Sequence, residues 1–258
     1  MSSVRRAIQV LDLLARKGAL GVRAVALHLD LPVGSTHRLL EDLAAERVVN
    51  RNEAGDWQLA YRLLEITDLQ MDGIQLPRLA RPFFDAMAEA TRETINLNVL
   101  SSGECICVDK VRGNEGMQLD WRIGTSSPLH CGGSAKAILA YMSAAEIERV
   151  AEGPLPGFTA HTITDPAALK AELAHIRQRG YAIDAEEIVL GIMCVGMPIF
   201  DRAGRPVGAI SISGPSHKEP GASVQPLVDM LSNACGQVSR SLGYIGGWPP
   251  SHTPTPTQ

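Results

Sequence analysis

Four consecutive polar residues near the N-terminus have side chains suited to binding DNA. They are Ser35, Thr36, His37 and Arg38. They open a helical pattern whose apolar positions recur through residues 33–44, directly behind a shorter amphipathic pattern at residues 22–29. Hydroxyl, imidazole and guanidinium groups at the front of a helix can form hydrogen bonds with base edges and phosphates in the major groove. Two short helices joined by a tight turn are typical of a helix-turn-helix, so we expect these four residues to contact DNA.

The flanking segments favour this interpretation over an ordinary helical hairpin in an all-helical core. Residues 48–59 predict a β-hairpin with a turn that contains Gly55, which would form a wing behind the second helix. Apolar residues also recur at helical spacing between Val4 and Ala15 and supply a third helix. We therefore predict a winged helix-turn-helix over residues 1–62.

The charge distribution agrees with DNA binding at one end of the chain. Residues 1–62 hold 9 Lys and Arg against 7 Asp and Glu, a net charge of +2. The remaining residues hold 15 against 21, a net charge of −6, and the two parts sum to the formal −4 of the whole chain. Because nonspecific affinity for nucleic acid comes from neutralising phosphates, an acidic body excludes a general nucleic-acid coat.

A second group of residues could bind a small anion. In the run from Ala209 to Ser213, period-two alternation places Ser211 and Ser213 on one face of a strand and two isoleucines on the other. These serines could face solvent or line a pocket. The glycines that precede Ser134 favour a pocket, because a helix that begins there leaves backbone N–H groups open to an anion. Hydroxyls and backbone N–H groups together could hold a carboxylate without a basic side chain.

The elements needed to position this second group predict an α+β domain on an antiparallel sheet. Strands are expected at Ile95–Leu100, Glu104–Val111, Met117–Ile123, Gly196–Phe200 and Pro206–Ser213. Helices are expected after Ser134, after a capping box at Ser143, from Asp165-Pro166 to Gly180, and from Val224 to Leu242. Leu63, Ile66 and Leu69 form an apolar stripe on a predicted linker helix over residues 63–78 that ends near Pro77. A helix from Phe83 to Glu93 would then open the second domain, residues 79–245.

At this point the chain resembles the IclR family of bacterial transcription regulators. The matching segments are Ser35 to Arg38, PLHCGGSAKAILA at 128–140, GYAIDAEEIVLGIMC at 180–194 and PIFDRAGRPVGAISISGP at 198–215. The resemblance implies a winged helix-turn-helix, a linker helix and a GAF-like domain that binds an effector. It also implies a homodimer or homotetramer on operator DNA. The implied function is a ligand-responsive transcription regulator, a repressor or dual regulator of a catabolic operon, that senses a small organic or aromatic carboxylate.

The resemblance also extends the candidate ligand site. Carried over residue by residue, the family's effector pocket corresponds to Gly133, Ser134, Asp184, Cys194, Ser211 and Ser213. Asp184 and Cys194 enter on the resemblance alone. On its own residues, Asp184 could instead cap a turn before Glu186, and Cys194, within an apolar run, could simply belong to the core.

Two other classes of function stay open on the sequence. A GAF-type enzyme could use a thiol nucleophile, and a metal- or redox-responsive regulator could use Cys131 and Cys194 with His130. Adjacent His130 and Cys131 would point apart on an extended segment, and the spacing of the three residues is not a zinc pattern. We therefore expect no catalysis, no metal and no other cofactor.

The sequence also bears on where the protein acts and on its C-terminal tail. The five cysteines form no paired framework, no signal peptide opens the chain, and no apolar run approaches the roughly 20 residues needed to span a bilayer. A cytoplasmic protein with no membrane contact is expected. The Pro- and Thr-rich tail, residues 246–258, is expected to be disordered.

Overall fold

The chain forms two compact units, residues 1–75 and 76–258. A computed structural model describes residues 2–72, 75–113, 122–216 and 223–248, and the side chains of residues 68–72 are outside this description. Within the described residues, no helix is both long and apolar enough to cross a membrane.

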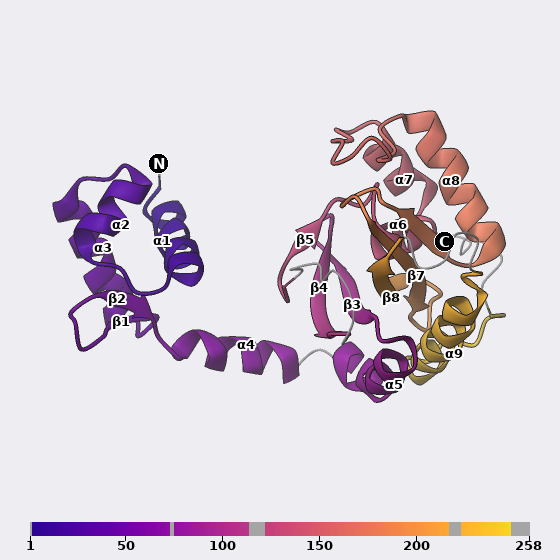
Figure 1. Cartoon of the computed structure of the whole chain (residues 1–258), viewed down its shortest axis with the longest axis horizontal. Helices are drawn as coiled ribbons and strands as arrows, with labels where there is room; N and C mark the ends of the chain where they lie inside the picture. Colours follow the sequence, from indigo (N-terminus) through magenta and orange to yellow (C-terminus); the bar gives the residue numbers. More distant parts are fainter. Residues whose placement is uncertain (1, 73–74, 114–121, 217–222, 249–258) are drawn as a thin grey trace. The chain divides into compact units, whose positions relative to one another are not determined.

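The N-terminal unit is a winged helix-turn-helix, as predicted (Figure 1). Its elements are α1 (Ser3–Lys17), α2 (Val22–Leu29), α3 (Val33–Ala45), β1 (Val49–Arg51), β2 (Trp57–Leu59) and α4 (Arg62–Asp72). Strands β1 and β2 pair antiparallel and form the wing. One residue or two from each of the first five elements meet in a small core, composed of Val10, Leu14, Val25, Leu40, Val49 and Trp57. Because the wing supplies Trp57 to this core, the hairpin is held directly against the helices.

The second unit is built on a six-stranded antiparallel sheet with the order β5-β4-β3-β8-β7-β6. Its strands are β3 (Thr94–Ser101), β4 (Glu104–Val111), β5 (Ser126–Ser127), β6 (Ala182–Ala185), β7 (Ile192–Phe200) and β8 (Pro206–Pro215). Its helices are α5 (Gln75–Thr91), α6 (Gly133–Leu139), α7 (Ala144–Ala151), α8 (Pro166–Arg179) and α9 (Gln225–Ser241). Helix α6 packs on one face of the sheet with α8 behind it, and α9 packs on the other face (Figure 1). The α+β class is confirmed.

The two central strands β3 and β8 position most of the polar residues discussed below. Alternation on β8 places Ile210 and Ile212 in the core, and Ser211 and Ser213 on the face that carries α6. Strand β3 pairs with β8 so that Asn96 lies opposite Ser211. Polar side chains of both strands therefore share one face of the sheet.

The residues that predict the ends of α7 and α8 cap these helices as expected. Ser143 and Glu146 form the predicted capping box of α7, and the Asp165 side chain caps α8 through the N–H of Ala168. Gly180 ends α8 with φ 87°, in the left-handed region where glycine has no steric cost.

The predicted boundary between linker helix and effector domain was wrong. Pro77 ends no helix, and a single helix, α5, runs from Gln75 to Thr91 through both Pro77 and Pro82. Pro77 is the third residue of α5, where the backbone N–H has no intrahelical acceptor, so the ring costs little. Leu76 and Phe84 are buried on the same helix and anchor it in the second unit.

The structure also bears on one predicted strand and on the C-terminal tail. The strand at Met117–Ile123 lies largely outside the described residues, and Arg122 and Ile123 form no strand. Most of the tail also lies outside them, but Gly246 to Trp248 are ordered against the domain. Trp248 packs on Phe200, and its indole N–H donates to Ser232 Oγ at 2.9 Å. Burying this aromatic ring offsets the entropic cost of fixing the short segment that carries it.

Candidate functional site: a helix-turn-helix surface and a polar cavity

The start of α3 presents an exposed polar surface. Ser35, His37 and Arg38 are exposed, and Pro32 begins the helix from an extended conformation. The Ser35 hydroxyl donates to the Pro32 carbonyl at 2.9 Å, which leaves its oxygen able to accept from another group. Three of the four predicted DNA-contacting residues are therefore on the surface that a recognition helix would offer.

Thr36 is the exception, and its predicted place on this surface was wrong. Its side chain is 0% exposed, and its hydroxyl donates to the Pro32 carbonyl at 3.1 Å. The helical period turns this position towards the core shared with α1 and α2, whereas positions 35, 37 and 38 turn outward. Thr36 therefore braces the start of the helix and cannot reach a base.

Arg51, on the wing, is a surface residue that the sequence analysis did not single out. Its guanidinium lies 4.4 Å from the centre of the Trp57 ring, and Nη2 donates to Glu41 Oε1 at 2.7 Å. It also lies 3.4 Å from His37 Nε2. The Glu41 carboxylate would repel a DNA phosphate, but the ion pair with Arg51 offsets its charge. The wing and the recognition helix thus share one network of charged side chains.

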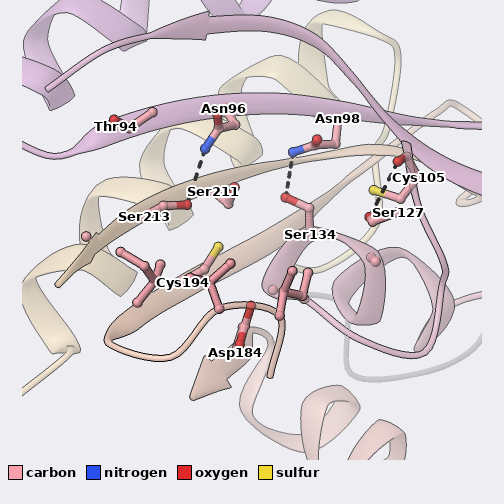
Figure 2. Close-up of a pocket in the computed structure, with 17 residues that line it drawn as sticks. Thr94, Asn96, Asn98, Cys105, Ser127, Ser134, Asp184, Cys194, Ser211 and Ser213 are labelled. Atoms are coloured by element: carbon pink, nitrogen blue, oxygen red, sulfur yellow. Dashed lines mark hydrogen bonds between the residues drawn. The ribbon is translucent and has the colours of Figure 1, made fainter. Parts of the chain in front are cut away.

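The second unit encloses a cavity of about 680 Å³, including its open mouth, between the sheet and the start of α6 (Figure 2). All six predicted ligand-binding positions line it: Gly133, Ser134, Asp184, Cys194, Ser211 and Ser213. Leu129, which precedes α6, belongs to the core beneath this helix. Ile188, Val189 and Ile192 supply apolar lining.

The cavity exists at this place because α6 begins directly against β7. Gly132 precedes the helix with φ 88°, which favours glycine. A Cβ built on Gly196 would lie 2.4 Å from the carbonyl carbon of Gly133, and one on Gly133 would lie 2.9 Å from Cys194 Sγ. Two backbones can approach this closely only where side chains are absent.

Two asparagines of β3 were missed by the sequence analysis. Asn98 Nδ2 donates to Ser134 Oγ at 2.8 Å, and Asn96 Nδ2 donates to Ser213 Oγ at 3.2 Å (Figure 2). Both asparagines are more than nine-tenths buried and line the cavity. The alternation of apolar and polar residues through TINLNVLS carried the signal for this polar face. Among the described lining residues there is no Lys or Arg.

Asp184 both lines the cavity and caps a turn. Its Oδ1 accepts from the backbone N–H of Glu187 at 2.6 Å, so both interpretations of this residue describe part of its environment. Burial raises the pKa of its carboxyl to about 6, against the lowering effect of that hydrogen bond. The neighbouring Glu187 carboxylate raises this pKa further, and Lys136 lowers it.

A buried ion pair fixes the turn that follows Asp184. Lys136, on α6, is 1% exposed and donates to the Glu187 carboxylate and, at 2.8 Å, to the carbonyl of Ile183. The other carboxylate oxygen of Glu187 accepts from the N–H of Gly132 at 3.1 Å. One backbone donor at the start of α6, expected to be open to an anion, is therefore already used by the protein.

The thiols around the cavity are poorly suited to nucleophilic or redox chemistry. Burial raises the pKa of Cys194 to about 11 and that of Cys131 to about 12, so both are protonated at neutral pH. His130 Nε2 donates to the Pro156 carbonyl at 3.0 Å. In the part of the chain that the structure describes, no three His, Cys, Asp or Glu side chains are grouped to hold a metal.

Fold and site together define a regulator with a winged helix-turn-helix unit and a second unit that contains a polar cavity. Two family models match: the IclR helix-turn-helix domain over residues 3–53, and the bacterial transcriptional regulator IclR C-terminal domain over residues 69–240. The chain belongs to the IclR family. Members of this family are transcriptional regulators, and the protein is accordingly a regulator and not an enzyme.

Individual relatives support the assignment. The HTH-type transcriptional regulator BhcR of Paracoccus denitrificans is 34% identical over 236 residues, which cover 91% of this chain and 85% of the relative. The transcriptional repressor IclR of Escherichia coli is 30% identical over 248 residues, 94% of this chain and 90% of the relative. A solved IclR homolog from Microbacterium hydrocarbonoxydans, in complex with 4-hydroxybenzoate, has a TM-score of 0.81 and 25% identity, and the match covers 93% of this chain and 99% of that one.

The exposed side chain of Arg38 generates the first prediction. Replacing it in Arg38→Ala should weaken binding to the operator by roughly 1–3 kcal/mol if it contacts a guanine, and the free energy of unfolding should change little. The measurement is a gel-shift titration on a promoter fragment that the wild-type protein binds. Arg16→Ala, an exposed arginine at the end of α1, is the matched control. Equal affinities for wild type and Arg38→Ala would contradict the assignment.

The second prediction follows from the raised pKa of the Asp184 carboxyl. Because the folded-state pKa of about 6 exceeds the unfolded value near 3.9, ionisation of this group destabilises the fold above pH 6. Asp184→Asn should therefore be more stable than wild type by about 1–3 kcal/mol at pH 8, with the difference fading as pH falls from 6 to 4. Urea unfolding at several pH values measures it. A difference that does not vary with pH would show that ionisation is not the cause.

Proposed function

We propose that this protein is a ligand-responsive repressor or dual regulator of a catabolic operon, whose effector is a small organic or aromatic carboxylate bound in the cavity of the second unit. Family membership supports the regulatory class, and the cytoplasm, where the operator lies, is the expected place of action. The observation that carries the choice of ligand is a cavity wall of hydroxyl and amide groups with no basic residue among the described lining residues. The IclR homolog from Microbacterium hydrocarbonoxydans is in complex with 4-hydroxybenzoate, an aromatic carboxylate, and this supports an effector of the same chemical class.

The proposed mechanism is linkage between effector and operator. The effector would contact Ser211 and Ser213, with Ser134 and Gly133 on the opposite wall, Cys194 beside them, and Asp184 accepting from a ligand hydroxyl. If effector binding changes the affinity for operator by a given factor, operator binding changes the affinity for effector by the same factor. The effector therefore acts by differential stabilisation of the conformations that bind DNA well and poorly.

The serines provide the test of this pocket. Because no basic residue is available, hydrogen bonds to the carboxylate must supply the affinity, at about 1.5–3 kcal/mol each. Ser211→Ala and Ser213→Ala should each weaken the best acid from a thermal-shift screen by roughly ten- to a hundred-fold in calorimetry. Operator binding without effector should stay near wild type. A cationic best ligand, or unchanged affinity when both serines are removed, would disprove the model.

We further propose that the protein works as a homodimer or homotetramer on a pseudo-palindromic operator. A single winged unit buries little surface on DNA, whereas two add their contacts. Apolar side chains on α4 are available for pairing: Leu64 is 65% exposed and Ile66 is 46% exposed. Leu63, of the predicted stripe, is partly buried, and the side chain of Leu69 is outside the described residues.

Sedimentation checks the assembly. At micromolar concentration the wild-type protein should sediment as a dimer or larger, because an exposed apolar stripe of this kind is stabilised by a second copy. Ile66→Glu should shift the distribution towards smaller species and weaken operator binding in parallel. A monomer that binds the operator with full affinity would contradict the proposal.

A further inference from the structure

Four buried serines line the cavity, and the hydroxyl protons of three of them, Ser127, Ser134 and Ser213, have different environments. Ser127 Oγ donates to the carbonyl of Cys105 at 3.5 Å, so its proton is engaged by the protein. Ser134 Oγ and Ser213 Oγ instead accept from the amide groups of Asn98 and Asn96. The residues are similarly buried, with exposed fractions of 7–8%. What differs is the partner that each hydroxyl finds.

A hydroxyl that accepts an amide N–H keeps its own proton for another partner. Around Ser134, the described residues offer no acceptor for that proton. At Ser213 the neighbouring group is the Cys194 thiol, which is a weak acceptor. Hydrogen bonds in series also polarise one another, so a hydroxyl that accepts from an amide becomes a better donor. Both hydroxyls are thus prepared to donate to whatever occupies the cavity.

We propose that Asn98 and Asn96 are positioning residues that fix Ser134 and Ser213 as hydrogen-bond donors, so that the cavity selects a ligand group that can only accept, a carboxylate. This inference rests on the proposed function and specifies how an uncharged wall distinguishes an acid from its neutral amide. The two pairs lie two residues apart on β3, and their hydroxyls come from α6 and β8, on different sides of the cavity (Figure 2).

Asn96 also presents an acceptor to the ligand. Its Nδ2 donates to Ser213, and its Oδ1 is buried without a hydrogen-bond partner among the described residues. A buried amide oxygen without a partner costs about 1–3 kcal/mol. Because this oxygen can only accept, a ligand that satisfies it carries a donor, such as a hydroxyl, in addition to the carboxylate that the serines bind.

The test compares three acids with their carboxamides on the full-length protein: acetate, glycolate and 4-hydroxybenzoate against acetamide, glycolamide and 4-hydroxybenzamide. Affinities are measured by calorimetry at constant ionic strength. At least one acid should bind wild type about tenfold more tightly than its amide, because the amide NH₂ cannot accept from an oriented hydroxyl. Asn98→Ala and Ser134→Ala should each weaken that acid about tenfold.

A double-mutant cycle separates positioning from simple structural damage. If Asn98 acts through Ser134, the double variant should bind no more weakly than Ser134→Ala alone. Ser127→Ala is the matched control: it removes a hydroxyl of the same cavity whose proton is already engaged, and should change the affinity less than about twofold. Additive losses in the double variant would overturn the inference.

Asn98→Asp supplies a readout that packing alone would not move. At pH 8 an aspartate has no proton to donate, so it would accept from Ser134 and repel the bound acid. As pH falls, a protonated carboxyl can donate again, and the affinity should recover relative to wild type. Asp184 titrates in both proteins, so its effect cancels in the ratio. The thiols of Cys105 and Cys194, with pKa values raised to about 12 and 11, stay protonated.

The outcomes distinguish this inference from the function on which it rests. If none of the three acids binds wild type, or each amide binds equally well, both the carboxylate effector and the inference fail. If an acid binds selectively but Asn98→Asp is neutral at every pH, the serine proton is engaged by the asparagine, and only the inference fails.

Discussion

The close approach of Gly133 and Gly196 is the contact on which the geometry of the effector domain depends. It places the backbone of α6 against β7 without intervening side chains, so the start of the helix lies within reach of the central strands. Ser134 can then meet Asn98, and Lys136, one turn along, can meet Glu187. A side chain at either glycine would move the helix away from the sheet and separate both pairs. The polar wall of the cavity and the buried ion pair behind it therefore share one origin in packing.

This arrangement keeps the charged side chain of Lys136 out of the described lining of the cavity. Lys136 donates to Glu187 and to the carbonyl of Ile183, so it stabilises the turn after Asp184 and leaves the cavity with hydroxyl and amide groups. The carboxyl of Asp184 is the exception. Because burial raises its pKa to about 6, its charge can change near physiological pH, and an anion bound beside it would favour the protonated form. If the proposed carboxylate binds here, a proton would accompany it into the cavity.

Much of the architecture was predictable because it depends on local patterns. Helix caps, the wing and the alternation of Ser211 and Ser213 with isoleucines are set by neighbours in sequence. Thr36 was misplaced because four consecutive residues cannot all share one face of a helix, and a stricter use of the helical period would have placed it inward. Proline at position 77 predicts the end of a helix, but the tertiary packing of Leu76 and Phe84 keeps α5 continuous through Pro77 and Pro82.

The rest of the site depends on pairings between residues that are distant in sequence. Asn96 and Asn98 stand on a strand whose alternation was visible, but only the position of β3 beside β8 brings Asn96 to Ser213, 117 residues away. Asp184 and Cys194 entered through a family resemblance, because neither has a local pattern that distinguishes a ligand contact from a cap or a core residue. Whether a serine hydroxyl donates or accepts a hydrogen bond is harder still to predict, because it depends on which partner the fold places beside it.

A binding wall without ion pairs has a consequence for how such a regulator can diverge. When a buried arginine anchors a ligand, losing either partner strands a charge and destabilises the protein, so the anchor resists change. Here Ser134, Ser211 and Ser213 can each be exchanged for another small neutral residue at the cost of a single hydrogen bond. Duplicated copies of such a gene could therefore acquire different inducers by successive substitutions in the cavity, while the scaffold that carries them stays folded throughout.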